Sequence, residues 1–82
     1  MDSNQAVSLL KKIIQINSVN PPGNETLVAN ELKELLGDHD IKTELVEYSE
    51  GRSNLIATLN GDAPGKVLGF TGHMDVVPPG QM

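Results

Sequence analysis

Hydrophobic residues near the start of the chain recur at three- and four-residue spacing, which is the period of an amphipathic helix. The apolar positions are Val7, Leu10, Ile13 and Ile14, and the polar residues between them include Lys11, Lys12 and Gln15. Asp2, Ser3 and Asn4 are residue types that cap helix N-termini. The helix must end before Pro21, because proline has no N–H to donate and pushes the preceding residue out of helical geometry.

A second helical pattern begins near Asn24 and Glu25, where a capping residue type precedes an acid that suits the positive end of a helix. Its apolar stripe consists of Val28, Leu32, Leu35 and Leu36. Gly37 directly follows this stripe. Because glycine is the residue most often found just past a helix C-terminus, we expect the helix to end there.

The pattern then changes to alternating or continuous apolar runs, which are typical of strands. Strands are predicted at residues 41–48, 54–59 and 66–71, with glycine-containing turns at 49–53 and 61–65. The third run is almost uninterrupted in its hydrophobicity, as in strands that are buried on both faces of a sheet. The fold class predicted is therefore α/β: two N-terminal helices followed by three strands of a mixed sheet.

Composition narrows the possible functions. The 82 residues carry 6 basic and 11 acidic side chains, a formal net charge of −5, and no cysteine. The missing cysteines exclude disulfides, thiolate zinc fingers and a cysteine nucleophile. An acidic chain is a poor electrostatic match for nucleic acid or anionic lipid, and its longest apolar helical stretch, residues 7–16, is too short to span a bilayer. We expect a cytoplasmic protein with neither kind of partner.

The candidate chemistry lies at Thr71-Gly72-His73-Met74-Asp75, at the carboxyl end of the third predicted strand, where open α/β sheets bind ligands. Residues two apart in an extended segment face the same way, so His73 and Asp75 can point into one site. A carboxylate that accepts a hydrogen bond from an imidazole is a common support for a metal-bound histidine. A structural loop histidine remains the alternative. His39, between two aspartates, is more simply explained as a residue of a solvated turn.

Residues 71–78 resemble the first signature of the acetylornithine deacetylase/succinyl-diaminopimelate desuccinylase family of di-zinc metallopeptidases and deacylases. That signature is Ser/Thr-Gly-His-x-Asp-Val-Val-Pro, and all eight positions match. Two further stretches of the chain agree with the family in the same order, residues 18–25 (SVNPPGNE) and residues 53–57 (SNLIA). The resemblance implies that residues 1–82 are the N-terminal part of a zinc-peptidase-like α/β/α catalytic domain. The rest of that domain and any lid or dimerisation domain would be absent.

The resemblance assigns roles to two residues. His73 matches the ligand of one zinc, and Asp75 matches the catalytic-site acid that orients that histidine without binding metal itself. The family holds two zinc ions, with cobalt as an alternative, and uses a metal-activated water to hydrolyse the amide bond of N-acyl amino acids or short peptides. Its other metal ligands and general base would lie beyond Met82, so the 82-residue piece should be inactive. A homodimeric parent is compatible with the resemblance.

Three alternatives stay open from the sequence. A dipeptidase or carboxypeptidase of the same family would share this segment, because the residues that read the substrate lie elsewhere. A truncated remnant without catalysis would keep the opening fold but not the chemistry. A small α/β domain could also carry Gly-His-x-Asp as a purely structural turn.

Overall fold

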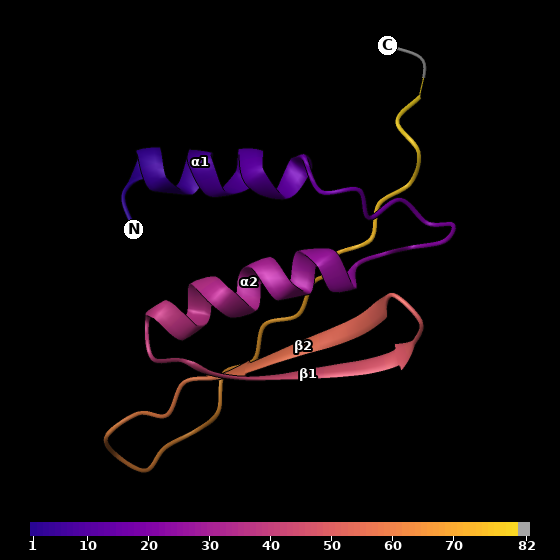
Figure 1. Cartoon of the computed structure of the whole chain (residues 1–82). Coiled ribbons are helices and arrows are strands. Elements are labelled where there is room, and N and C mark those ends of the chain that lie inside the picture. The colour runs from indigo at the N-terminus through magenta and orange to yellow at the C-terminus, as the bar shows by residue number, and fades with distance from the viewer. Residues whose placement is uncertain (81–82) are drawn as a thin grey trace.

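The computed structural model describes residues 1–80, so the last two residues of the predicted catalytic segment, 81–82, lie outside the described residues. The elements follow the order α1 (Ser3–Ile14), α2 (Thr26–Asp38), β1 (Lys42–Ser49) and β2 (Arg52–Thr58). Figure 1 shows the two helices lying side by side, with the β1–β2 hairpin next to α2. No helix among residues 1–80 combines the length and the apolar character needed to cross a bilayer.

The N-terminus of α1 is fixed by a capping box, as the capping residue types predict. The Asp2 carboxylate accepts a hydrogen bond from the Gln5 backbone N–H at 2.8 Å, and the Gln5 side chain accepts one from the Asp2 N–H at 2.8 Å. Two of the otherwise unpaired N–H groups of the first turn are thereby satisfied. No residue of α1 is buried, and its apolar side chains Val7, Leu10 and Ile14 are more than half exposed.

The second helix continues beyond its predicted end, because the left-handed residue that follows it is Asp40 and not Gly37, three residues earlier. Gly37 lies inside α2, which ends at Asp38 with His39 as its C-cap. Asp40 has the left-handed φ of 58°, its N–H donates to the Gly37 carbonyl, and the Ile41 N–H donates to the Leu36 carbonyl. These two bonds form a Schellman motif with aspartate in the place that glycine usually takes. Aspartate tolerates this conformation better than most residues, so the glycine rule did not locate the end.

The strands β1 and β2 form an antiparallel hairpin, with Lys42 opposite Thr58 and Leu45 opposite Leu55. Thr43 and Leu45 are half-buried while their neighbours in β1 are exposed, which confirms the predicted alternation. The hairpin turns at Gly51, which has a φ of +74°. The only fully buried hydrophobic side chains among the described residues are Val28 and Ala29 on α2.

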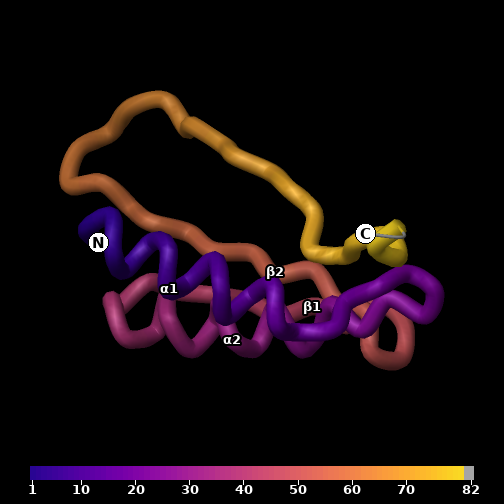
Figure 2. The backbone as a smooth tube through the Cα atoms, turned by 90° about the horizontal axis from the view of Figure 1, so that it is seen from above, coloured from indigo at the N-terminus to yellow at the C-terminus, as the bar shows by residue number. Residues whose placement is uncertain are grey.

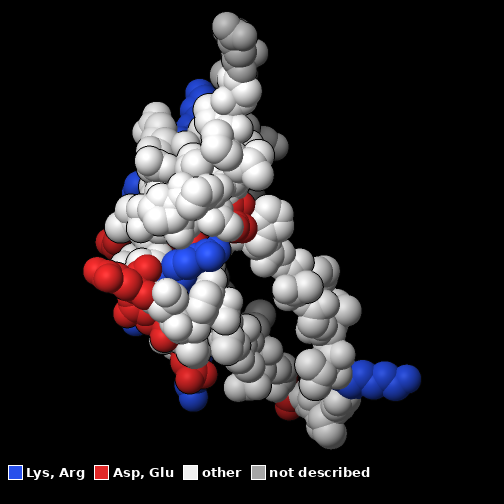
Figure 3. Space-filling model, turned by 90° about the vertical axis from the view of Figure 1, so that its right-hand side faces the viewer, with Lys and Arg blue, Asp and Glu red and all other residues white. Residues whose placement is uncertain are grey.

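The third predicted strand is not formed. Residues 59–75 contain no strand. The sheet within residues 1–80 consists of β1 and β2 alone, which run antiparallel to each other. Figures 2 and 3 show this segment as an extended arm that lies apart from the hairpin, with open space between the two. Val67, Leu68 and Phe70 are 96%, 79% and 91% exposed. A hydrophobic run becomes a doubly buried strand only when neighbours pair with its backbone and cover both its faces, and no described residue does so here.

Candidate functional site

The segment around His73 is anchored to the loop between the two helices. The Asn20 N–H donates to the Val76 carbonyl at 2.8 Å, and the Val76 N–H donates to the Ser18 carbonyl at 3.1 Å, which makes a short parallel bridge. The buried Ser18 hydroxyl donates to the Met74 carbonyl at 2.8 Å. Residues 56 to 58 positions apart in the sequence are thereby brought together, although residues 66–71 before His73 form no strand.

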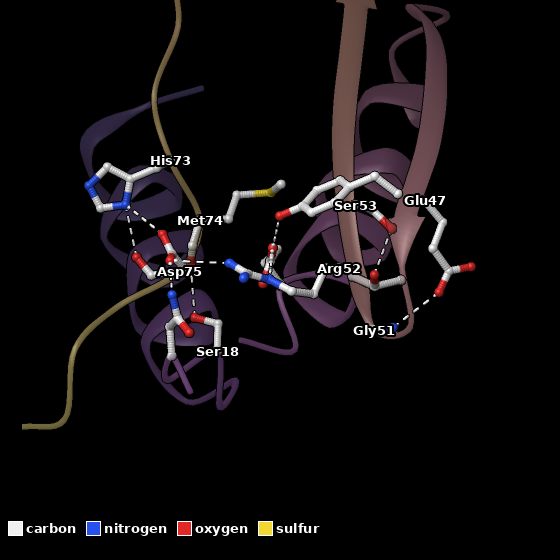
Figure 4. A network of polar contacts seen from close by, with 12 residues as sticks. Ser18, Glu47, Gly51, Arg52, Ser53, His73, Met74 and Asp75 are labelled. Atoms are coloured by element: carbon white, nitrogen blue, oxygen red, sulfur yellow. Dashed lines mark hydrogen bonds and ion pairs between the residues drawn. The ribbon is translucent and has the colours of Figure 1, made fainter. Parts of the chain in front are cut away.

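His73 and Asp75 lie on the same side of the chain, as the two-residue spacing predicts. Nδ1 of His73 is 2.9 Å from the Asp75 carbonyl oxygen and 3.1 Å from the carboxylate Oδ1 (Figure 4). Both of these atoms are acceptors, so Nδ1 carries the proton and donates. The proton is then absent from Nε2 of the neutral ring, which leaves its lone pair available on a side chain that is 83% exposed.

The Asp75 carboxylate has two further partners on its other oxygen, Oδ2. The Asn20 amide Nδ2 donates to it at 3.1 Å, and Nη2 of Arg52 lies 3.5 Å away. The hydrogen bond from Asn20, followed by the contacts with His73 and Arg52, holds the pKa of Asp75 below its ordinary value against the opposing effect of burial. Asp75 is therefore an ionised acceptor in the neutral pH range.

Arg52 connects this carboxylate to a second one. Its Nε donates to Oε1 of Glu25 at 2.9 Å, and the Tyr48 hydroxyl donates to the same oxygen at 2.9 Å. Glu25 is only 4% exposed, and its other oxygen, Oε2, has no hydrogen-bond partner among residues 1–80. Burial by itself would raise the pKa of Glu25, but hydrogen bonds from its own backbone, Tyr48 and Arg52 together bring it below the ordinary value.

His73 and Asp75 fit the role of one zinc ligand and its supporting carboxylate. Zinc accepts neutral imidazole nitrogen, and a bound imidazole usually donates its other N–H to a carboxylate or carbonyl, as His73 does. A catalytic zinc site normally has three protein ligands. No cluster of three or more histidine, aspartate or glutamate side chains that could hold a metal occurs within residues 1–80. The described residues therefore provide one oriented ligand and its support, not a complete site.

The sequence predicted that His73 and Asp75 share one site, but it assigned no role to Asn20 or Arg52. It gave Glu25 only a place at the start of the second helix. Asn20 and Glu25 lie in the family-like stretch 18–25, which was the available signal. Arg52 was placed in a turn, where a single arginine has no visible partner. His39 caps the end of α2 and is exposed, far from the network, as a residue of a solvated turn should be.

Known proteins resemble almost the whole chain. A probable succinyl-diaminopimelate desuccinylase of Staphylococcus aureus is 37% identical over 76 residues, which are 93% of this chain and 18% of that protein. The corresponding protein of Staphylococcus epidermidis is 39% identical over 74 residues, which are 90% of this chain and 17% of that protein.

An acetylornithine deacetylase of Arabidopsis thaliana is 36% identical over 91 aligned positions, covering 94% of this chain and 21% of that protein. This chain belongs to the acetylornithine deacetylase/succinyl-diaminopimelate desuccinylase family. It spans about a fifth of the length of the curated relatives it matches. No family model and no solved structure matches it.

Proposed function

We propose that this chain is the N-terminal part of the catalytic domain of a zinc-dependent amidohydrolase of the deacetylase/desuccinylase type. Its substrates would be N-acyl amino acids, whose amide bond is hydrolysed. The observation that carries the proposal is the His73–Asp75 pair, in which the carboxylate holds the imidazole proton on Nδ1 and leaves Nε2 exposed. The names of the family relatives support the type of reaction.

His73 would bind the metal through Nε2, and Asp75 would keep the ring in the required tautomer and orientation. Zinc at such a site polarises the amide carbonyl and lowers the pKa of water so that it can attack. The ionised Asp75 makes the imidazole more electron-rich and so a better ligand. Because one histidine cannot hold a catalytic zinc, the 82-residue chain would be inactive without the remaining ligands.

The other expectations for the whole protein belong to the same proposal. We place it in the cytoplasm, with a small N-acyl amino acid or short peptide as its partner and neither nucleic acid nor membrane. This agrees with the net charge of −5 and with the missing cysteines. A homodimer and two metal ions per site would follow from family membership.

A chimera tests the proposal. The chain replaces the matching 76-residue segment of the Staphylococcus aureus relative, and hydrolysis of the succinyl amide of diaminopimelate is measured with zinc present. We expect an active chimera that loses activity completely when His73→Ala is introduced. His39→Ala is the matched control, because it removes the chain's other histidine at an exposed position, and it should retain activity. Full activity of the His73→Ala chimera would contradict the proposal.

A further inference from the structure

The buried carboxylate of Glu25 has no part in the chemistry proposed above. It is 4% exposed, lies at the start of α2, and makes no capping hydrogen bond to the helix it precedes. Its side chain instead accepts from Tyr48 in β1 and from Arg52 in β2. A charged group buried in this way needs an opposite charge beside it, and Arg52 supplies that charge.

The same guanidinium also faces the candidate site. Nε of Arg52 is bound to Glu25, while Nη2 lies 3.5 Å from Oδ2 of Asp75 (Figure 4). The two carboxylates are 50 positions apart in the sequence and belong to different segments. The planar fork of arginine can bond one acid with one edge while its other end faces a second acid, which the point charge of lysine cannot do.

The backbone at Gly23 leaves room for this arrangement. A Cβ at Gly23 would lie 2.8 Å from Nε of Arg52 and 3.0 Å from Oε2 of Glu25. The guanidinium also lies over the ring of Tyr48, and Cζ of Arg52 is 5.8 Å from the ring centroid. Arg52 is therefore held by a carboxylate and an aromatic ring, with the loop backbone packed closely against it.

We infer that Arg52 is a positioning residue for the His73–Asp75 pair. Anchored on buried Glu25, it fixes Oδ2 of Asp75 together with Asn20, so that Oδ1 stays directed at Nδ1 of His73 and Nε2 of His73 stays free to bind metal. Through Asp75, the hairpin thereby reinforces the tautomer that the Asp75 backbone carbonyl also favours, without a hydrogen bond of its own to His73. The catalytic meaning of this inference rests on the proposed function, but the geometry it predicts does not require metal.

The test is the tautomeric state of His73 in the metal-free 82-residue chain. Long-range ¹H–¹⁵N NMR spectra at a pH where the ring is neutral distinguish the Nδ1–H from the Nε2–H form. We expect His73 to be mainly Nδ1–H. His39 serves as an internal reference, since its exposed ring should show the tautomer mixture of an unrestrained imidazole. A wild-type His73 that matches His39 would overturn the inference.

Arg52→Gln is the decisive variant. It should lower the ratio of Nδ1–H to Nε2–H at His73 by roughly tenfold, the scale of one lost charged hydrogen bond. Lys42→Gln removes the same charge from an exposed position of the same hairpin and should change nothing. Arg52→Lys should restore only part of the ratio. An unchanged ratio in Arg52→Gln would overturn the inference.

A variant outside the hairpin covers the case in which Arg52→Gln unfolds β1 and β2, which cross-strand NOEs would reveal. Asn20→Ala removes the other donor to Oδ2 while leaving in place the backbone hydrogen bond from the N–H of residue 20 to the carbonyl of Val76. It should shift the His73 ratio in the same direction, and an unchanged ratio would overturn the inference. Zinc added afterwards tests the proposed function separately: selective broadening of His73 supports it, and equal effects on His73 and His39 contradict it.

Discussion

Replacing Gly23 with alanine should destabilise the chain and disturb its charged network together. Gly23 has a φ of +96°, a conformation that costs an L-residue about 1–2 kcal/mol. The added Cβ would also lie 2.8 Å from Nε of Arg52, closer than real Cβ atoms approach, and 3.0 Å from Oε2 of Glu25, which is a tight contact. Either the arginine or the loop must move, which weakens a buried charged hydrogen bond.

The expected loss follows from these contributions. Alanine restricts the unfolded chain more than glycine does, which favours folding by about 0.4–1 kcal/mol. The backbone strain outweighs this gain, and displacement of the charged hydrogen bond adds to the loss. We therefore expect Gly23→Ala to lower the free energy of unfolding by about 1–3 kcal/mol. Urea unfolding followed by far-ultraviolet circular dichroism measures the change.

Gly37→Ala is the matched control for this prediction. Gly37 lies inside α2, and apart from its neighbours and the backbone of its own helix, no atom in the described part of the chain lies within 4 Å of the position a Cβ would take. The same substitution should stabilise the chain there by about 0.5–1 kcal/mol, because alanine is the better helix former. If Gly23→Ala proved as stable as Gly37→Ala, the close packing of Arg52 against the Gly23 backbone would be refuted.

Three further predictions concern the helix cap, the acids and the metal. Asp2→Ala removes the capping box of α1 and should cost that helix about 1 kcal/mol, seen as a loss of helical circular dichroism that Asp62→Ala, in the exposed arm, does not produce. The pKa values of Glu25 and Asp75 are lowered in the folded chain, so the ionised carboxylates stabilise the fold fully above their ordinary pKa values of 4.5 and 3.8. This stabilisation is lost as the pH falls below those values. The free energy of unfolding, measured from pH 7 to pH 3, should therefore fall less steeply in Glu25→Gln than in the wild type. The 82-residue chain should bind zinc only weakly in calorimetry, and a tight stoichiometric complex would contradict the view that its site is incomplete.

Local signals in the sequence predicted much of the fold. Asp2 and the apolar positions of α1 and α2 act within one or two helical turns, so their effect is visible without knowledge of distant residues. The end of α2 was missed because Asp40, not glycine, adopts the left-handed conformation. The spacing of His73 and Asp75 predicted their pairing for the same local reason.

The third strand and the role of Arg52 could not be predicted, because both depend on partners distant in sequence. Residues 66–71 carry the hydrophobicity of a central strand, but a strand forms only beside neighbouring strands, which the described residues do not supply. Arg52 illustrates the same limit within the site. Its partners Glu25 and Asp75 are 27 residues before it and 23 residues after it, so only the fold reveals that one guanidinium faces both.

Metal binding in the chimera with the Staphylococcus aureus relative tests the proposed role of His73 as a zinc ligand. Zinc content after dialysis would be compared in the unsubstituted chimera and in its His73→Ala and His39→Ala variants. We expect His73→Ala to lose tightly bound zinc and His39→Ala to retain as much as the unsubstituted chimera. Equal zinc content in all three proteins would contradict it.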